Sequence, residues 1–465
     1  MPVPDASNPT GDKGEIRALN RNYYSILRLS LNQQRFVALP VLLVMAMMII
    51  FSGAGSAAAA NAAGAPELDA KSAILMDAST GQVLYELDAD TARAPASMTK
   101  MMTEYLVFKA IEEGKLSWDQ TITVQENAAK QIGSRVFLAV GDKHTVEDLY
   151  KAMAIGSAND ATVQLAETVA GSEEAFAKLM NEAAVELGMT NSHFINSTGL
   201  DRADMPEAYR PTSIEGETVM SARDSALLAY HILKDYPEFL EYSKIPSFKF
   251  RERDADPVIN YNWMLESNAS VTNFKKFAYE GVDGLKTGHT SNAGNCFTGT
   301  ALRNGTRLIA VVMGVPGGMN DGKRFLETAK LFDYGFGSFE KQTVVAAKAV
   351  VTEHETFKVK KGASKKVNVV TATDITILVP KGSKVEPTVT EATPLTEPLL
   401  APIKSGDKVG SVTYTYKDPS TQDDKNVTID LVAADDVKKA GWFKLMLRAI
   451  GDFFSSLFKG IVDLF

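Results

Sequence analysis

The stretch Ala96-Ser97-Met98-Thr99-Lys100 decides how the rest of the chain is interpreted. It precedes an apolar run over residues 101–111, whose spacing predicts a helix that stops at Gly114. Because positions i and i+3 of a helix share a face, the amine of Lys100 can reach the hydroxyl of Ser97. A hydroxyl beside an amine base is the pairing that covalent acyl transfer uses. At the N-terminal end of a helix, free backbone N–H groups also favour a developing anion.

Two other Ser-x-x-Lys strings occur in the chain, from Ser338 to Lys341 and from Ser405 to Lys408. Both lie in or beside a region rich in valine and threonine, for which we predict strands and turns. Residues three apart in a strand do not share a face. We therefore interpret these two strings as solvated surface residues.

Composition excludes several classes of function. The chain has 465 residues, a formal net charge of -8 and no long basic cluster, which argues against nucleic-acid binding. Cys296 is the single cysteine, so neither an intrachain disulfide nor a cysteine-based zinc site is possible. The five histidines are scattered without a His-Glu-x-x-His motif, so we expect no metal or other cofactor and disfavour a zinc carboxypeptidase. His144 with Glu147 is a single pair, expected to be exposed at a helix start.

The N-terminal region predicts export from the cytoplasm. Four arginines precede an apolar run over residues 36–51, which is followed by small residues up to Ala65. This is the layout of a secretory signal peptide over residues 1–65, although its basic part is unusually long. An uncleaved N-terminal anchor is the alternative. Both interpretations place the remainder outside the cytoplasm.

Residues 66–337 are predicted to form an α+β catalytic domain. A hairpin is expected from strands at 72–77 and 82–87, and paired strands at 296–301 and 307–314. Helices are expected from Thr145 to Ala154 and over residues 161–170, 173–187, 222–233 and 323–332. Residues 242–250 have the pattern of a strand.

The last part of the chain has a different amino-acid composition. Short valine- and threonine-rich runs predict a separate all-β domain over residues 338–438. Residues 439–465 follow, in which six charged or polar side chains share one arc of a helix and the remaining face is apolar and aromatic. We predict an amphipathic helix that lies in a membrane interface. The alternative is a terminal helix packed on the β domain.

Three short motifs occur in a fixed order along the chain. Ser97-x-x-Lys100 is placed on a helix, Ser157-x-Asn159 on a turn between helices, and Lys286-Thr287-Gly288 on a strand. This trio is typical of penicillin-binding proteins and class A β-lactamases. Over residues 68–336 the chain resembles the low-molecular-mass penicillin-binding proteins, specifically the secreted serine-type D-alanyl-D-alanine carboxypeptidases. The resemblance implies their transpeptidase fold, an antiparallel sheet flanked by helices with a helical subdomain.

The resemblance also implies a mechanism. Ser97 attacks the carbonyl of the penultimate D-alanine of a peptidoglycan stem peptide, releases the terminal D-alanine, and is the residue that β-lactams acylate. Lys100 is the base, which requires a pKa lowered by burial and by a neighbouring cation such as Lys286. The catalytic residues implied are Ser97, Lys100 and Ser157, the last as a proton relay. The substrate-binding residues implied are Asn159, Lys286, Thr287, Gly288, His289 and Thr290, with the backbone N–H groups of Ser97 and His289 as the oxyanion hole.

Several alternatives remain open. Class A β-lactamases carry Ser-Asp-Asn and a Glu-x-x-Leu-Asn loop, whereas this chain has Ala158 in the middle position and no such loop after it. A peptidase inhibited by penicillin is therefore favoured over a lactamase. The motifs do not separate a carboxypeptidase from an endopeptidase, and a non-enzymatic cell-wall binding protein is the rival outside enzymes. The loop over residues 198–210 is a candidate for assisting deacylation, without an assigned residue.

Overall fold

The computed structural model describes residues 64–462, and their side chains as far as residue 454. Except for its last two residues, the predicted signal segment lies outside the described part of the chain.

A five-stranded antiparallel sheet forms the centre of the catalytic region, in the order β2-β1-β9-β8-β7. Its strands are β1 (Ser72–Asp77), β2 (Val83–Leu87), β7 (Val282–Thr290), β8 (Gly294–Arg303) and β9 (Thr306–Val315). The predicted hairpin β1–β2 is present, and Ile74 of β1 lies opposite Val311 of β9. Strand β7 is at one edge of this sheet.

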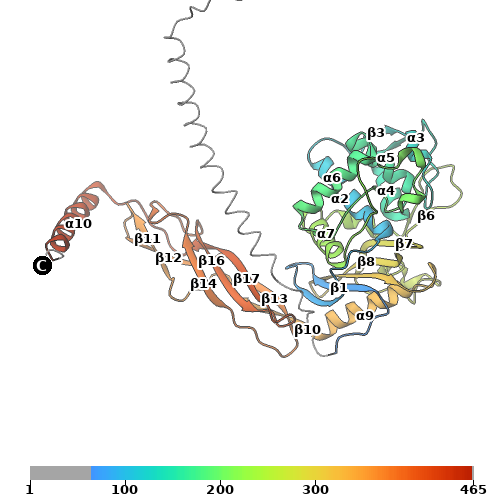
Figure 1. Ribbon diagram of the computed structural model, residues 1–465. Coiled ribbons are helices and arrows are strands. Elements are labelled where there is room, and N and C mark those ends of the chain that lie inside the picture. The colour runs from blue at the N-terminus through green and yellow to red at the C-terminus, as the bar shows by residue number, and fades with distance from the viewer. Residues whose placement is uncertain (1–63, 463–465) are drawn as a thin grey trace, which may run out of the picture. The chain divides into compact units, whose positions relative to one another are not determined.

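Both faces of the sheet are covered, so its inner strands are apolar throughout. On β1, Ile74 and Met76 belong to a core shared with the helical subdomain, whereas Ala73 and Leu75 belong to a second core with α9 (Lys323–Ser338). Figure 1 shows α9 along one side of β1 and β8, and the helical subdomain on the other. The architecture is the α+β arrangement that the resemblance implied.

The helical subdomain begins with the short 3-10 helix η1 (Ala96–Thr99), which leads directly into α2. Its α-helices are α2 (Lys100–Glu112), α3 (Glu126–Ala129), α4 (Val146–Gly156), α5 (Asn159–Ala170), α6 (Glu173–Glu186), α7 (Ala222–Asp235) and α8 (Phe239–Ser243). Short pieces complete it: β3 (Thr121–Thr123), β4 (Lys143–Thr145), β5 (Ser247–Phe248), β6 (Val258–Ile259), η2 (Arg202–Asp204), η3 (Glu207–Tyr209) and η4 (Glu266–Ser270). The side chains of Thr145, Ser172 and Ser221 cap α4, α6 and α7, because each accepts a hydrogen bond from a backbone N–H of the first turn.

Two local predictions were wrong. Residues 242–250 are not one strand, because α8 occupies their start and only β5 is extended. His144 is not exposed: its side chain is 11% accessible and its ring stacks on Phe250 at 4.8 Å between centroids. In both cases aromatic residues of this segment pack against the subdomain core, and only Ser247 and Phe248 form a short ladder with β6.

Residues 339–433 form the predicted β structure. Its strands are β10 (Phe339–Val345), β11 (Thr356–Lys360), β12 (Lys366–Thr371), β13 (Ile375–Pro380), β14 (Thr388–Pro394), β15 (Leu399–Leu400), β16 (Lys408–Lys417) and β17 (Asp424–Ala433). Strands β10 and β13 pair with each other, and the others form a sheet in the order β14-β16-β17-β12-β11-β15. Its buried valines, leucines and tyrosines make a core of their own.

The chain continues into helix α10 (Trp442–Val462). The amine of Lys444 donates to the carbonyl of Ala363, and the guanidinium of Arg448 donates to the carbonyls of Gly362 and Ala363. Seven large apolar side chains of its described part are exposed: Trp442, Phe443, Met446, Leu447, Ile450, Phe453 and Phe454. No helix within the described residues is long and apolar enough to cross a membrane.

Candidate active site

A cavity of about 440 Å³ lies where η1, the α4–α5 junction and β7 meet. Seven of the nine predicted site residues line it: Ser97, Ser157, Asn159, Thr287, Gly288, His289 and Thr290. The two motif lysines lie beneath this surface, since Lys100 is 0% and Lys286 is 3% exposed. The fold therefore brings together all the residues that sequence order had associated.

Ser97 and Lys100 form the contact that their spacing predicted. The Nζ atom of Lys100 lies 3.0 Å from the Oγ atom of Ser97. The predicted α-helix differs in one respect, because Ser97 lies on the 3-10 turn η1 and α2 begins at Lys100. In a 3-10 helix, residues i and i+3 lie directly above one another, so the side chains of Ser97 and Lys100 leave the turn in the same direction.

The backbone around the serine is strained. Ala96 has a φ of +50°, a left-handed conformation that an alanine rarely adopts. Gly199 packs directly against it with a φ of +80°, and a Cβ atom at Gly199 would lie 1.9 Å from the carbonyl oxygen of Ala96. Only glycine fits this position. A loop distant in sequence thus holds the turn that presents Ser97.

The same loop also holds the lysine. The carbonyl oxygen of Thr198 accepts a hydrogen bond of 2.9 Å from Lys100 Nζ, and the hydroxyl of Thr103 donates to the carbonyl of Ser197. Behind the loop, Glu173 Oε1 accepts hydrogen bonds from the backbone N–H (3.1 Å) and the hydroxyl (2.8 Å) of Ser197. Asn127 donates to the other oxygen of Glu173 at 3.3 Å. The position of Lys100 therefore depends on a buried carboxylate that no sequence motif indicated.

The surroundings of Lys100 favour an uncharged amine. Burial lowers the pKa of Lys100 well below its usual range, and the positive charge of Lys286 lowers it further. The anions of Glu104, Glu173 and Asp160 act in the opposite direction but do not outweigh burial. A neutral amine has one lone pair, and the nearby hydroxyl of Ser97 can donate to it.

Ser157 and Asn159 enter the cavity from the turn between α4 and α5. Ser157 ends α4 in a left-handed conformation (φ +53°), and its Oγ atom is buried without a hydrogen-bond partner among the described residues. The Nδ2 group of Asn159 donates to the carbonyl of Ile132 at 2.6 Å, and its backbone N–H donates to the carbonyl of Ser134 at 2.7 Å. Asn159 thus ties the turn to the rim loop, which we define as residues 132–140.

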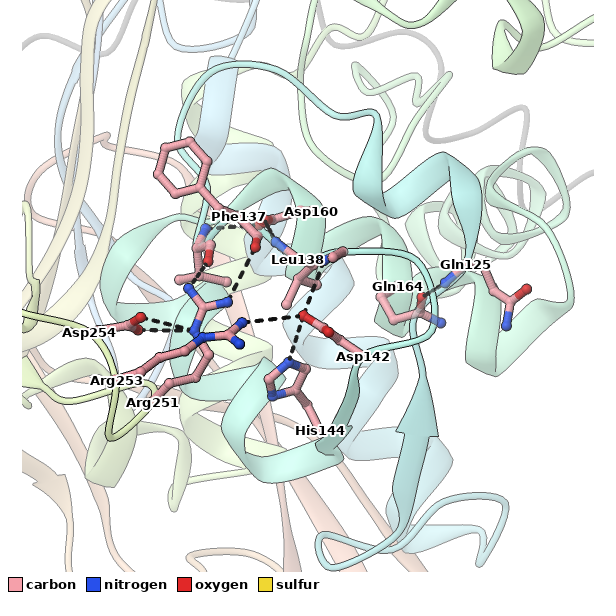
Figure 2. A network of polar contacts seen from close by, with 12 residues as sticks. Gln125, Phe137, Leu138, Asp142, His144, Asp160, Gln164, Arg251, Arg253 and Asp254 are labelled. Atoms are coloured by element: carbon pink, nitrogen blue, oxygen red, sulfur yellow. Dashed lines mark hydrogen bonds and ion pairs between the residues drawn. The ribbon is translucent and has the colours of Figure 1, made fainter.

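Two charged residues hold the rim loop in place (Figure 2). Asp160 of α5 accepts hydrogen bonds from the backbone N–H groups of Val136 and Leu138. The guanidinium of Arg251 donates to the carbonyls of Val136 and Phe137, and Asp254 accepts two hydrogen bonds from the same arginine. These contacts fix the loop that carries the partners of Asn159.

Strand β7 forms the opposite wall. Lys286, Gly288 and Thr290 alternate along one face of it. A Cβ atom at Gly288 would lie 2.5 Å from the carbonyl oxygen of Pro95, so the glycine lets the strand approach η1. His289 Nδ1 lies 3.0 Å from Asn295 Oδ1. Strand β7 is at the sheet edge and its residues 287–290 line the cavity, an arrangement in which an extended ligand can lie beside the strand.

Sequence reasoning missed Arg324. This residue of α9 is 6% exposed, lines the cavity and donates to the carbonyl of Gly288 at 2.9 Å. A second hydrogen bond of 2.7 Å runs to the carbonyl of Met319. The guanidinium of Arg324 therefore adds a second positive charge to the β7 wall of the cavity, beneath which Lys286 lies. The available signal was weak, because one arginine in the first turn of a helix is common in sequences.

The two other Ser-x-x-Lys strings make no such pairing. Lys341 donates to the carbonyl of Gly305, whereas Ser405 donates to the carbonyl of Ala434 and Lys408 pairs with Asp430 at 2.8 Å. Among the described residues, no group of three or more histidine, cysteine, aspartate or glutamate side chains is placed to hold a metal ion.

This site and fold define a class of penicillin-binding-protein-like peptidases, and comparison with known proteins makes the class specific. Residues 59–317 match the D-alanyl-D-alanine carboxypeptidase family, and residues 339–439 match the C-terminal domain of penicillin-binding protein 5. The chain belongs to the D-alanyl-D-alanine carboxypeptidase family. Its function is that of a D-alanyl-D-alanine carboxypeptidase, and the lactamase and non-enzymatic alternatives are not favoured.

Individual relatives match over most of the chain. D-alanyl-D-alanine carboxypeptidase DacF of Bacillus subtilis is 34% identical over 384 residues, which cover 83% of this chain and 90% of DacF. DacC of Escherichia coli is 34% identical over 387 residues, which cover 82% of this chain and 87% of DacC. Among solved structures, a peptidoglycan synthesis regulatory factor (PBP3) of Streptococcus pneumoniae has a TM-score of 0.70 at 30% identity, covering 80% of this chain and all of that one. Penicillin-binding protein 5 of Haemophilus influenzae has a TM-score of 0.61 at 30% identity, covering 80% and 99% of the two chains.

Proposed function

We propose that the carboxypeptidase acts through an acyl-enzyme on Ser97, with Lys100 as the general base. The observation that supports this most directly is the 3.0 Å separation of Lys100 Nζ and Ser97 Oγ in a site where the lysine is fully buried. Burial and the charge of Lys286 favour the amine form, which can take the hydroxyl proton as the oxygen attacks. The second hydrogen bond, to the carbonyl of Thr198, keeps the lone pair directed at Ser97.

In the first half of the reaction, Ser97 Oγ bonds to the carbonyl carbon of the penultimate D-alanine and its proton passes to Lys100. The carbon–nitrogen bond then breaks, and the proton reaches the leaving amine by way of Ser157. In the second half, the oxygen of a water molecule bonds to the ester carbon while Lys100 accepts a proton from the water. The bond between this carbon and Ser97 Oγ then breaks, Oγ takes the proton from Lys100, and the shortened peptide leaves with a new terminal carboxyl group. The unpaired hydroxyl of Ser157 supports its role as relay.

The substrate we propose is a peptidoglycan stem peptide that ends in D-Ala-D-Ala. An extended peptide fits beside the free edge of β7, and Asn159 offers an amide to its backbone. The terminal carboxylate meets the hydroxyls of Thr287 and Thr290 over the charges of Lys286 and Arg324. Backbone N–H groups of Ser97 and His289 form the oxyanion hole, a contribution of about 3 kcal/mol per donor.

The test is a single variant read in two ways. Ser97→Ala should abolish both release of D-alanine from a D-Ala-D-Ala peptide and the covalent penicillin adduct seen by mass spectrometry, while the wild-type adduct maps to Ser97. Release that persists in the variant would rule out Ser97 as the nucleophile. Supplying the same enzyme with a cross-linked dimer peptide separates carboxypeptidase from endopeptidase action.

We also propose that α10 attaches the protein to the outer face of the cytoplasmic membrane. Its polar side chains Lys444 and Arg448 are used in contacts with residues 362–363, whereas Trp442, Phe453 and other large apolar side chains face solvent. A helix that packs on a globular domain buries its apolar face, whereas α10 exposes that face. Removal of residues 441–465 should abolish flotation with anionic lipid vesicles and leave D-alanine release intact. Flotation of the shortened protein would contradict this role.

A further inference from the structure

Glu104 is a buried carboxyl group for which the proposed reaction has no use. It lies one turn beyond Lys100 on the same face of α2 and is 0% exposed. Neither of its oxygens accepts a hydrogen bond from the described residues. Glu173 and Asp160, the other buried acids near Lys100, accept three hydrogen bonds each. Glu104 is therefore not a structural acceptor, and its effect on its surroundings is one of charge.

The side chain of Lys286 points towards the same region. Gly288 lies two residues farther along β7 and on the same face, and a Cβ atom there would meet Pro95 and Met98 of the η1 turn. This face of the strand is thus directed at η1 and the start of α2, which pack against β7. Lys286 is buried, and its hydrogen bond to the Thr287 carbonyl is long at 3.4 Å. Its ammonium lacks a strong partner among the described residues.

The two neighbouring lysines affect the pKa of Glu104 unequally. Burial raises the pKa of Glu104, and the positive charge of Lys286 opposes this rise more than that of Lys100 does. Burial lowers the pKa of Lys286, and the anion of Glu104 acts against this fall. Four other titratable groups face Glu104, Lys286 and Lys100. They are Arg324 on α9, Glu173 on α6, Asp160 on α5 and Tyr150 on α4.

The proposed reaction needs different states of the two lysines. Lys100 must be an amine, whereas Lys286 must be a cation that attracts the substrate carboxylate. A carboxyl is intrinsically a much stronger acid than an ammonium, so when pH rises the carboxyl gives up its proton first and the two groups become an ion pair. That ion pair then retains the ammonium to higher pH. A carboxyl that acts mainly on Lys286 therefore lets Lys286 remain an ammonium while Lys100 is an amine.

We propose that Glu104 is a positioning residue that acts through Lys286, keeping it a cation over the pH range in which Lys100 is an amine. The inference rests on the roles proposed above for Lys100 and Lys286. It assigns a function to a residue that touches neither the substrate cavity nor Ser97, and it predicts a change in pH dependence that a purely structural residue would not produce.

The experiment compares pH profiles of kcat/KM for D-alanine release. Glu104→Gln and Glu104→Met both remove the charge, and the methionine variant retains a flexible apolar side chain suited to a buried site. We expect the basic limb of both variants to move to lower pH by about one unit, with KM rising more than kcat falls at alkaline pH. Glu104→Asp retains a carboxylate and should keep the basic limb in place. Glu112→Gln, which removes a charge from the exposed end of the same helix, is the matched control and should match the wild type.

The results separate this inference from the mechanism on which it rests. Thermal unfolding first identifies which variants are folded, and the methionine variant provides the test if the glutamine variant is not. A basic limb that stays in place in a folded charge-free variant overturns the role of Glu104. A wild-type penicillin adduct on a residue other than Ser97 overturns the mechanism instead.

Discussion

Replacement of Glu173 tests whether the loop behind the candidate active site positions Lys100, the proposed base. In Glu173→Ala, the backbone N–H and hydroxyl of Ser197 lose their acceptor, whereas Asn127 keeps a hydrogen bond of 2.9 Å to Glu167. A buried donor without a partner costs about 1–3 kcal/mol, and the hydroxyl of Ser197 can rotate to another acceptor. We therefore expect the free energy of unfolding to fall by about 2–4 kcal/mol.

The activity should fall further than stability alone explains. The carbonyl that orients Lys100 belongs to Thr198, the residue directly after Ser197, so a relaxed loop moves the amine away from its 3.0 Å approach to Ser97. A displacement of about 1 Å at a catalytic group reduces the rate by about 10²-fold. We expect a drop of that size in kcat and in the rate of penicillin acylation under conditions where the variant is fully folded.

The assays are urea unfolding and stopped-flow acylation by a fluorescent penicillin. Glu174→Ala is the control, since this neighbouring carboxylate accepts its hydrogen bonds at the surface from residues 212 and 213. Glu173→Gln should have an acylation rate and a free energy of unfolding between those of Glu173→Ala and Glu174→Ala, because its amide nitrogen would face the amide nitrogen of Asn127. If Glu173→Ala acylates as fast as Glu174→Ala, the loop does not position the base and the reasoning is refuted.

Four further predictions follow from single contacts. Gly199→Ala should lower the free energy of unfolding by at least about 1–2 kcal/mol and slow acylation, because a left-handed alanine is strained and its Cβ would meet the carbonyl of Ala96; urea unfolding and acylation rates check this. Lys100→Arg should abolish acylation although the charge is retained, because a guanidinium does not deprotonate at accessible pH; mass spectrometry of penicillin-treated protein is the measurement. Arg251→Ala should raise KM more than it lowers kcat, because the rim loop loses the contacts that hold the hydrogen-bond partners of Asn159, the proposed substrate-binding residue; steady-state kinetics with a D-Ala-D-Ala peptide would show this difference. A hydroxyl and two backbone N–H groups hold the pKa of Glu174 at about 2, below its ordinary 4.5. The contribution of this carboxylate to stability is therefore present above pH 4.5 and is lost as pH falls towards 2. In Glu174→Gln, the free energy of unfolding should depend less on pH between 4.5 and 2, which acid unfolding would measure.

Local patterns predicted much of this protein, because several of its features are local. The spacing of Ser97 and Lys100, the capped start of α4 and the alternating strands β8 and β9 depend on neighbours in sequence. The order of three motifs then indicated which distant residues would meet. What each residue does in the reaction stays a prediction until the variants are measured.

The rest depends on contacts that no local pattern encodes. The left-handed turn at Ala96 packs against Gly199, which lies in a loop about one hundred residues away and leaves no room for a Cβ atom. Glu173 matters because α6 places its carboxylate within hydrogen-bond reach of Ser197. Arg324 matters because the first turn of α9 places its guanidinium within reach of the Gly288 carbonyl on β7. The segment over residues 242–250 was mistaken for a strand because aromatic residues suit a ladder as well as a subdomain core.

The open edge of β7 also has a consequence for colloidal stability. A strand edge with unpaired backbone groups is a template on which another chain can add a strand, and proteins usually block such edges. Here the edge is the wall of the active site, so blocking it would exclude the substrate. We therefore expect the part of this edge that lines the cavity to stay open to strand addition. An acylating inhibitor that fills the edge should delay heat-induced aggregation in proportion to its occupancy of the site.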